Sequence, residues 1–203
     1  GGKGGVSLNA AWLKSDGIDA LGQSGERDGF ENLTISGKAI ARPSPDGELG
    51  ISARYNRADT EFDGFNDFFV HDQTLDASRI ETHAVNGWAT YGTDAAAPWT
   101  LSIQGMLIDS ENRNRNGNTP LNKTSGRRVR VGAQATHRFA IGGSNHRLTL
   151  AVEDVFERFT ASDDQYFGAT DQRRTRENLA FVGEWRGRFG EMLDLGAAIR
   201  HDN

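Results

Sequence analysis

The chain has 203 residues, of which 36% are hydrophobic and 25 are glycine, and its net charge is −5 at pH 7. It has no cysteine, which excludes a disulfide scaffold, a thiolate metal site and a cysteine nucleophile. The negative charge also argues against a general nucleic-acid binder. The longest apolar runs are four residues, as in Ala10–Leu13, whereas a transmembrane helix needs roughly 20.

Alternation of apolar and polar residues is the main pattern in the sequence. Trp99, Leu101 and Ile103, for example, alternate with Thr100 and Ser102. Side chains two residues apart lie on the same face of a strand, so this pattern predicts strands with one apolar and one polar face. It recurs along the chain and predicts nine strands, at 5–16, 31–42, 48–60, 80–93, 99–111, 127–140, 146–161, 176–189 and 192–203.

The connections between these strands fall into two alternating classes. Short turns are expected at 43–47, 94–98, 141–145 and 190–191, where glycine, proline, asparagine and aspartate gather. Long polar loops are expected at 17–30, 61–79, 112–126 and 162–175. The sequence therefore predicts an all-β fold, an antiparallel up-and-down meander of about nine long strands.

The strand faces favour a transmembrane barrel over a soluble sheet. Transmembrane strands need roughly 9–11 residues, with short turns on one side of the bilayer and long loops on the other. Aromatic residues lie near both ends of the apolar faces, as in the two interfacial girdles of a barrel: Tyr91, Trp99, Phe139 and Phe189 near the short turns, and Trp12, Tyr55 and Phe156 near the long loops. The opposite face is rich in arginine and is expected to line a wet lumen. A soluble β-meander or solenoid is the alternative.

No enzyme motif accompanies this pattern. The sequence has neither a phosphate-binding glycine loop nor a nucleophile elbow, and its five histidines lack metal-ligand spacing. Basic residues do cluster in or beside the long loops. Two interpretations of these clusters are open, a solvated rim or contact with lipopolysaccharide phosphates or an anionic ligand. The clusters are Arg113/Arg115, Arg127/Arg128/Arg130 and Arg173/Arg174/Arg176.

Carboxylates lie at the ends of the first three expected strands. In a meander these ends are neighbours at one rim, so Asp19, Glu26, Asp28 and Asp63 are candidates to converge. Several hard oxygen ligands in a flexible loop suit calcium. Scattered, solvated acids are the alternative interpretation.

Several short segments resemble TonB-dependent outer-membrane receptors, and within them the vitamin B12 (cobalamin) transporter group. The resemblance rests on strand order, loop placement and short motifs: Asp16–Asp19, Arg27–Phe30, the turn at Pro43–Gly47, Asp59–Phe65, Leu75–Arg79 and Leu195–Asn203. It implies a 22-stranded barrel in the bacterial outer membrane, closed by an N-terminal plug and driven through TonB.

Under this resemblance residues 1–203 form a partial barrel domain, with the plug and the remaining strands absent. The implied function is active uptake of cobalamin or a ferric siderophore by a carrier that is not an enzyme. The implied partners are outer-membrane lipid, lipopolysaccharide and TonB, with no nucleic acid. Calcium would bind Asp19, Glu26, Asp28 and Asp63, and Phe65, Phe68 and Phe69 are candidate substrate contacts, with loop packing as their alternative role.

A complete small outer-membrane barrel, acting as a passive pore or an adhesin, is the rival hypothesis. It requires the first and last strands to pair. Bacterial single-chain barrels use even strand numbers, and nine is odd, so we predict an open, curved sheet in which strands 5–16 and 192–203 do not pair.

Overall fold

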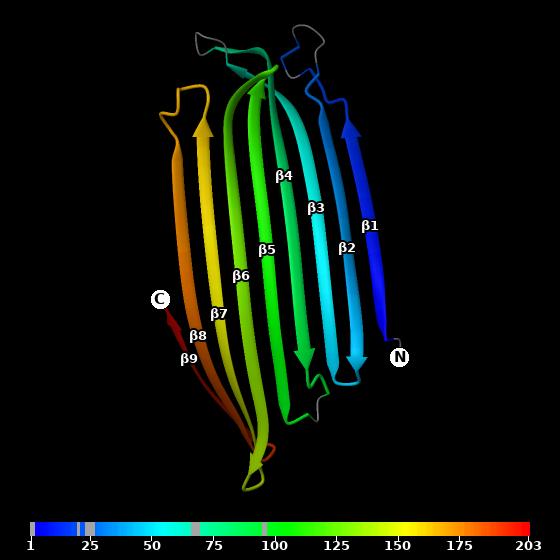
Figure 1. The fold of residues 1–203 in the computed structure, drawn as a ribbon, viewed down its shortest axis with the longest axis vertical. Coiled ribbons are helices and arrows are strands. Elements are labelled where there is room, and N and C mark those ends of the chain that lie inside the picture. The colour runs from blue at the N-terminus through cyan, green and yellow to red at the C-terminus, as the bar shows by residue number, and fades with distance from the viewer. Residues whose placement is uncertain (1–2, 20, 23–26, 66–69, 95–96) are drawn as a thin grey trace.

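The computed structural model describes residues 3–19, 21–22, 27–65, 70–94 and 97–203. The described residues form nine strands and no helix that could span a membrane. Figure 1 shows the strands side by side, with β9 ending partway along the molecule. They are β1 (Gly4–Ser15), β2 (Phe30–Ser44), β3 (Gly47–Phe65), β4 (His71–Tyr91), β5 (Trp99–Asn116), β6 (Thr119–Ile141), β7 (Ser144–Asp163), β8 (Gln172–Phe189) and β9 (Leu193–Asp202).

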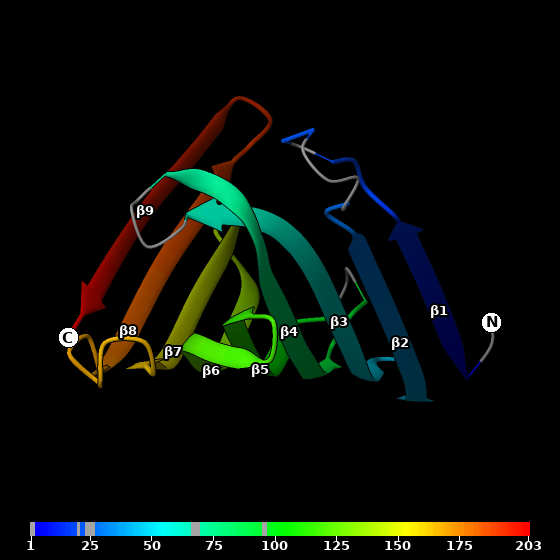
Figure 2. The same ribbon diagram turned by 90° about the horizontal axis from the view of Figure 1, so that it is seen from above.

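Each strand pairs antiparallel with the next one along the chain, in a single sheet. Within the described residues β1 and β9 are the two edges and do not pair with each other. The predicted all-β meander and its open edges are therefore confirmed. Figure 2 shows that the sheet bends into a trough.

Several strands extend beyond their expected ends, whereas β9 (Leu193–Asp202) is slightly shorter than the expected 192–203. Residues 112–126 were expected to form a long loop, but β5 continues to Asn116, the turn is 117–118, and β6 starts at Thr119. Residues 61–79 likewise become mostly strand, because β3 ends at Phe65 and β4 starts at His71. In these extensions most residues are polar and the few apolar ones, such as Phe62 and Leu75, do not alternate, so the hydropathy pattern stops although the backbone ladder continues.

The sheet has no second layer packed against it. Among the described residues only Ala77, Val155 and Ala180 are buried hydrophobic side chains. Large apolar side chains such as Ile103 (60% exposed) and Ile199 (74% exposed) lie uncovered. A face of this kind needs an apolar partner.

The opposite, polar face is the inner wall of the trough. Three hollows are lined mainly by side chains of this face, which identifies it as the concave side. We call it the luminal face and the apolar side the outer face.

Candidate functional site

The outer face carries an apolar belt of limited height. In β5 the outward residues are apolar from Trp99 to Leu107, and the next two outward residues are Asp109 and Glu111. The nine residues from Trp99 to Leu107 match the roughly 9–11 that a tilted transmembrane strand needs. The remainder of the strand therefore projects beyond the belt, on the side of the β7–β8 connection at 164–171.

Stacked rings border the belt near the short turns, as the aromatic pattern predicted. The row runs across β5–β8 and consists of Trp99, His137, Phe139, His146 and Trp185. Successive ring centroids lie 4.1 Å to 5.8 Å apart. Rings with an apolar body and a polar edge suit a membrane–water interface. The two histidines were not expected in this row, because histidine is a polar residue and was not counted among the aromatic side chains of the apolar face.

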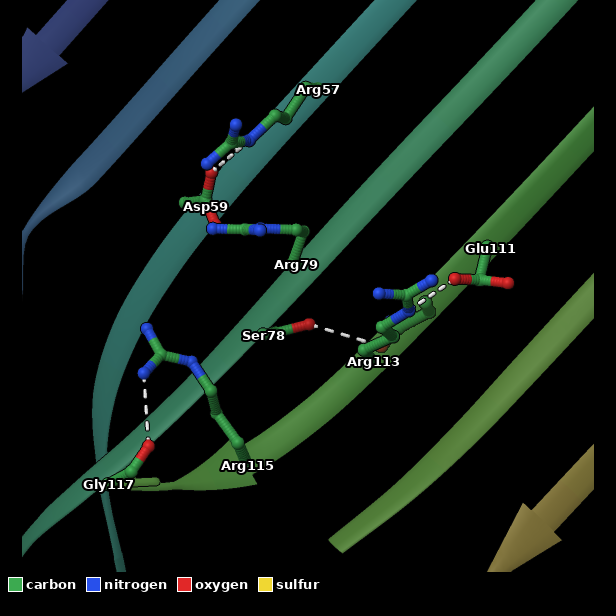
Figure 3. A network of polar contacts seen from close by, with 9 residues as sticks. Arg57, Asp59, Ser78, Arg79, Glu111, Arg113, Arg115 and Gly117 are labelled. Atoms are coloured by element: carbon green, nitrogen blue, oxygen red, sulfur yellow. Dashed lines mark hydrogen bonds and ion pairs between the residues drawn. The ribbon is translucent and has the colours of Figure 1, made fainter. Parts of the chain in front are cut away.

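Beyond the apolar belt the same outer face becomes a belt of ion pairs (Figure 3). Asp59 of β3 accepts from Arg57 Nε at 2.8 Å and from Arg79 Nε of β4 at 2.6 Å. Burial raises the pKa of Asp59, but the hydrogen bonds from Arg79 and Arg57 outweigh it and the pKa is lowered. We call this region the charged belt.

The charged belt continues across β5 and β6. Glu111 pairs with Arg113 and, at 2.6 Å, with Lys123 Nζ, and the Lys123 hydrogen bond is the main cause that lowers the pKa of Glu111. Arg127 Nε donates to Asp109 Oδ2 at 2.8 Å. The belt is thus a row of fixed positive and negative charges directly above an apolar surface.

The luminal face holds a second set of charges. Glu157 of β7 pairs with Arg128 of β6 (3.5 Å) and with Arg176 of β8 (2.6 Å). Below this row Arg130, whose register partner is Val155, donates diagonally from Nε to Glu153 Oε2 at 2.7 Å. The sequence grouped Arg127, Arg128 and Arg130 together, and the structure separates them between the two faces.

One aromatic side chain also lies on the luminal face. Trp88 of β4 lies over Gly50 of β3, donates its Nε1 hydrogen to Glu48 at 3.1 Å and has Lys38 Nζ 5.2 Å from its ring centre. Arg42 pairs with the same glutamate at 3.0 Å. Because Gly50 has no side chain, the Trp88 ring has room on the luminal face. This explains why Trp88 does not lie on the outer face with the other apolar residues of its strand.

The candidate calcium ligands lie at one rim, but the described ones have other contacts. The Asp28 amide donates to the Ile18 carbonyl at 3.2 Å, which brings the segments of Asp19 and Asp28 together. Asp19 Oδ1 accepts from the Gly22 amide at 2.5 Å, and Asp63 Oδ1 from the Thr74 amide of β4 at 3.3 Å. Within the described residues no group of three His, Cys, Asp or Glu could hold a metal. Glu26 lies outside the described residues.

The candidate substrate contacts are only partly described. Phe65 ends β3, is paired in register with His71 and is 65% exposed. Phe68 and Phe69 lie outside the described residues. Their role as substrate contacts stays a prediction.

The β7–β8 connection is held by one buried carboxylate that sequence reasoning missed. Asp163 accepts from the amides of Gln165 and Tyr166 and from the Thr170 hydroxyl. The Tyr166 amide is the largest cause that lowers the pKa of Asp163. An aspartate followed by polar turn residues was the available signal. The contacts fix the connection that leads into β8.

Comparison with known proteins shows similarity in structure only. No family model and no curated protein sequence matches the chain. Among solved structures it is similar to the RagAB peptide transporter (13% identity, TM-score 0.65) and to the outer-membrane transporter YddB from Escherichia coli (10% identity, TM-score 0.69). It is also similar to the siderophore receptor PiuA from Acinetobacter baumannii (11% identity, TM-score 0.57).

These similarities cover almost all of this chain and a smaller part of the others. The alignments include 98% of this chain but 30%, 32% and 42% of the RagAB, YddB and PiuA chains. The nine-stranded sheet therefore has the fold of part of such a transporter.

Proposed function

We propose that this chain forms part of the barrel wall of a TonB-dependent transport receptor in the bacterial outer membrane. The observation that carries the proposal is the single-layer sheet, which exposes an apolar belt on one face and a charged luminal face on the other. Lipid covers the belt, and water and substrate occupy the lumen. Further strands complete the barrel, and the 22-strand count stays a prediction.

The substrate class follows from the shared fold only as a proposal. A siderophore receptor and a peptide transporter are among the similar structures, and we place this protein with the importers of such medium-sized solutes. A ferric siderophore is our first candidate. Cobalamin, which the sequence resemblance suggested, is the second. Transport of this kind needs no catalytic residue.

The experiment is an uptake assay with the intact protein. Cells that lack their own receptors are given this receptor and labelled ferric siderophores or cobalamin. We expect accumulation that disappears when TonB is deleted. Accumulation that persists without TonB would instead support a passive pore. A complete small barrel formed by these nine strands alone is disfavoured, because they leave two open edges in the described part of the chain.

Lipopolysaccharide is the proposed partner of the charged belt. Arg57, Arg79 and Arg127 project from the same face as the apolar belt, beyond its upper limit. The outer leaflet places phosphate groups at that height, and arginine forms strong paired hydrogen bonds with phosphate.

Calcium binding at the rim is a separate part of the proposal and depends on Glu26, because the described carboxylates alone form no metal group. If calcium ties Asp19, Glu26, Asp28 and Asp63 together, it orders the rim and strengthens substrate binding. We expect calorimetry on the intact receptor to show weaker substrate binding in chelator than in calcium. The difference should disappear in Asp28→Ala. Equal substrate affinity in calcium and in chelator would rule the site out.

A further inference from the structure

A hollow of about 400 Å³ lies on the luminal face between β5 and β8. Its lining includes Ile108, Gly126, Arg128, Glu157, Phe159 and Arg174. In the sheet register Gly126 pairs with Phe159, and Phe159 with Arg174, so these three residues form one row on the luminal face. Directly below it, Ile108, Arg128, Glu157 and Arg176 form the next row.

The charges of this hollow are unbalanced. Five arginines line it, and Glu157 contributes the one carboxylate of the lining. Arg128, Arg174 and Arg176 lie on the luminal face, whereas Arg127 and Arg158 have the parity of the outer face. Glu157 pairs with Arg128 and Arg176, and so holds these two side chains on either side of it. Arg174 forms no ion pair within the described part of the chain. Positive charges held close together repel one another, so an anion entering the hollow would relieve the repulsion.

The floor of the hollow is open because position 126 has no side chain. A Cβ atom built on Gly126 would meet no atom within 4 Å. Beside this gap lie the ring of Phe159, which is 41% exposed, and the side chain of Ile108. The site therefore offers guanidinium groups next to an apolar surface, which suits a compact ligand that carries carboxylates on an apolar body.

We infer that this hollow, the arginine cup, binds a carboxylate-bearing part of the imported solute on its way into the lumen. The inference rests on the proposed function and gives it a substrate class: anionic solutes. The position agrees with this role, since Gly126 and Phe159 lie three residues beyond Val129 and Phe156 of the apolar belt, toward the end of the sheet where β7 leads into β8. The Asp163 contacts hold the connection that leads into β8, so the backbone that carries Arg174 is ordered before binding.

Adjacent arginines provide a matched pair of variants. Arg173 and Arg174 are neighbours in β8, both are exposed, and their side chains alternate between the outer and luminal faces. Arg174→Gln removes a charge from the cup, and Arg173→Gln removes the same charge from the outer face. Gly126→Leu fills the gap without changing any charge.

The test measures binding to the purified intact receptor by calorimetry. Two carboxylate probes distinguish the possible sources: ferric citrate for an iron complex and a five-residue glutamate peptide for an acidic peptide. Their comparators are a ferric hydroxamate without carboxylates and a glutamine peptide of the same length. We expect at least one carboxylate probe to bind more tightly than its comparator. Arg174→Gln and Gly126→Leu should weaken that binding roughly tenfold, and Arg173→Gln should change it less than about twofold.

Several results would overturn the inference. One is that neither carboxylate probe binds more tightly than its comparator. Another is that Arg173→Gln and Arg174→Gln have equal effects, which would indicate general charge attraction. A third is that Arg174→Gln has no effect in a receptor that folds normally, as judged by its heat-dependent gel migration. Binding is measured without TonB, so this test is independent of the uptake assay. If the wild-type receptor shows TonB-dependent uptake but Arg174→Gln does not change binding, the proposed function stands and only the arginine cup is refuted.

Discussion

At the scale of single residues, Gly50 is a luminal position where an added side chain would collide with a neighbouring ring. A Cβ atom there would lie 2.0 Å from the Trp88 ring. We predict that Gly50→Ala displaces Trp88 from Glu48 and Lys38 and destabilises the barrel by about 1–3 kcal/mol. Tryptophan fluorescence and urea unfolding in lipid vesicles measure both effects.

Gly132→Ala is the matched control for this prediction. It lies on the same luminal face, and its added Cβ would meet the Val152 carbonyl oxygen at an ordinary 3.5 Å. We expect its stability to stay near the wild-type value. Equal losses of stability in the two variants would mean that the loss of glycine's backbone flexibility, and not the displacement of Trp88, causes the effect.

At the scale of strands, the sequence predicted those parts in which one face is apolar. The alternation of Trp99, Leu101 and Ile103 located β5 because lipid-facing and water-facing side chains must differ. It could not locate the end of β5, since Glu111 and Arg113 on the outer face alternate with polar Asn112 and Asn114. Hydropathy carries no signal where both faces meet water or headgroups.

The same reasoning explains what was missed at the candidate site. The parity of Arg127 and Arg128 was available in the sequence and already assigned them to opposite faces. What the sequence lacked was the cross-strand register that places Arg128, Glu157 and Arg176 in one row. These contacts join residues from three strands. The alternation within each strand does not say which residues of neighbouring strands face each other. The carboxylate rim, in contrast, was expected from connectivity and stays a prediction; within the described residues Asp63 Oδ1 accepts from the Thr74 amide.

At the scale of the whole molecule, the sheet is stable only with partners on its faces and edges. It has almost no buried core, and β1 and β9 present unpaired backbone groups among the described residues. Open strand edges invite pairing with further strands, and a bilayer requires that every backbone group be satisfied. Lipid around the apolar belt and closure by additional strands meet both requirements at once.

Membrane assembly of the intact barrel therefore tests the assignment of the two faces. Ile103 points to the outer face and is 60% exposed, whereas Gln104 points to the lumen. We predict that Ile103→Asp impairs assembly at a cost on the order of 2 kcal/mol, because its carboxylate would face the hydrocarbon. Gln104→Asp should assemble normally, since its carboxylate faces water. Heat-dependent gel migration of isolated outer membranes reports the folded fraction, and equal tolerance of both variants would show that water, not lipid, covers the outer face.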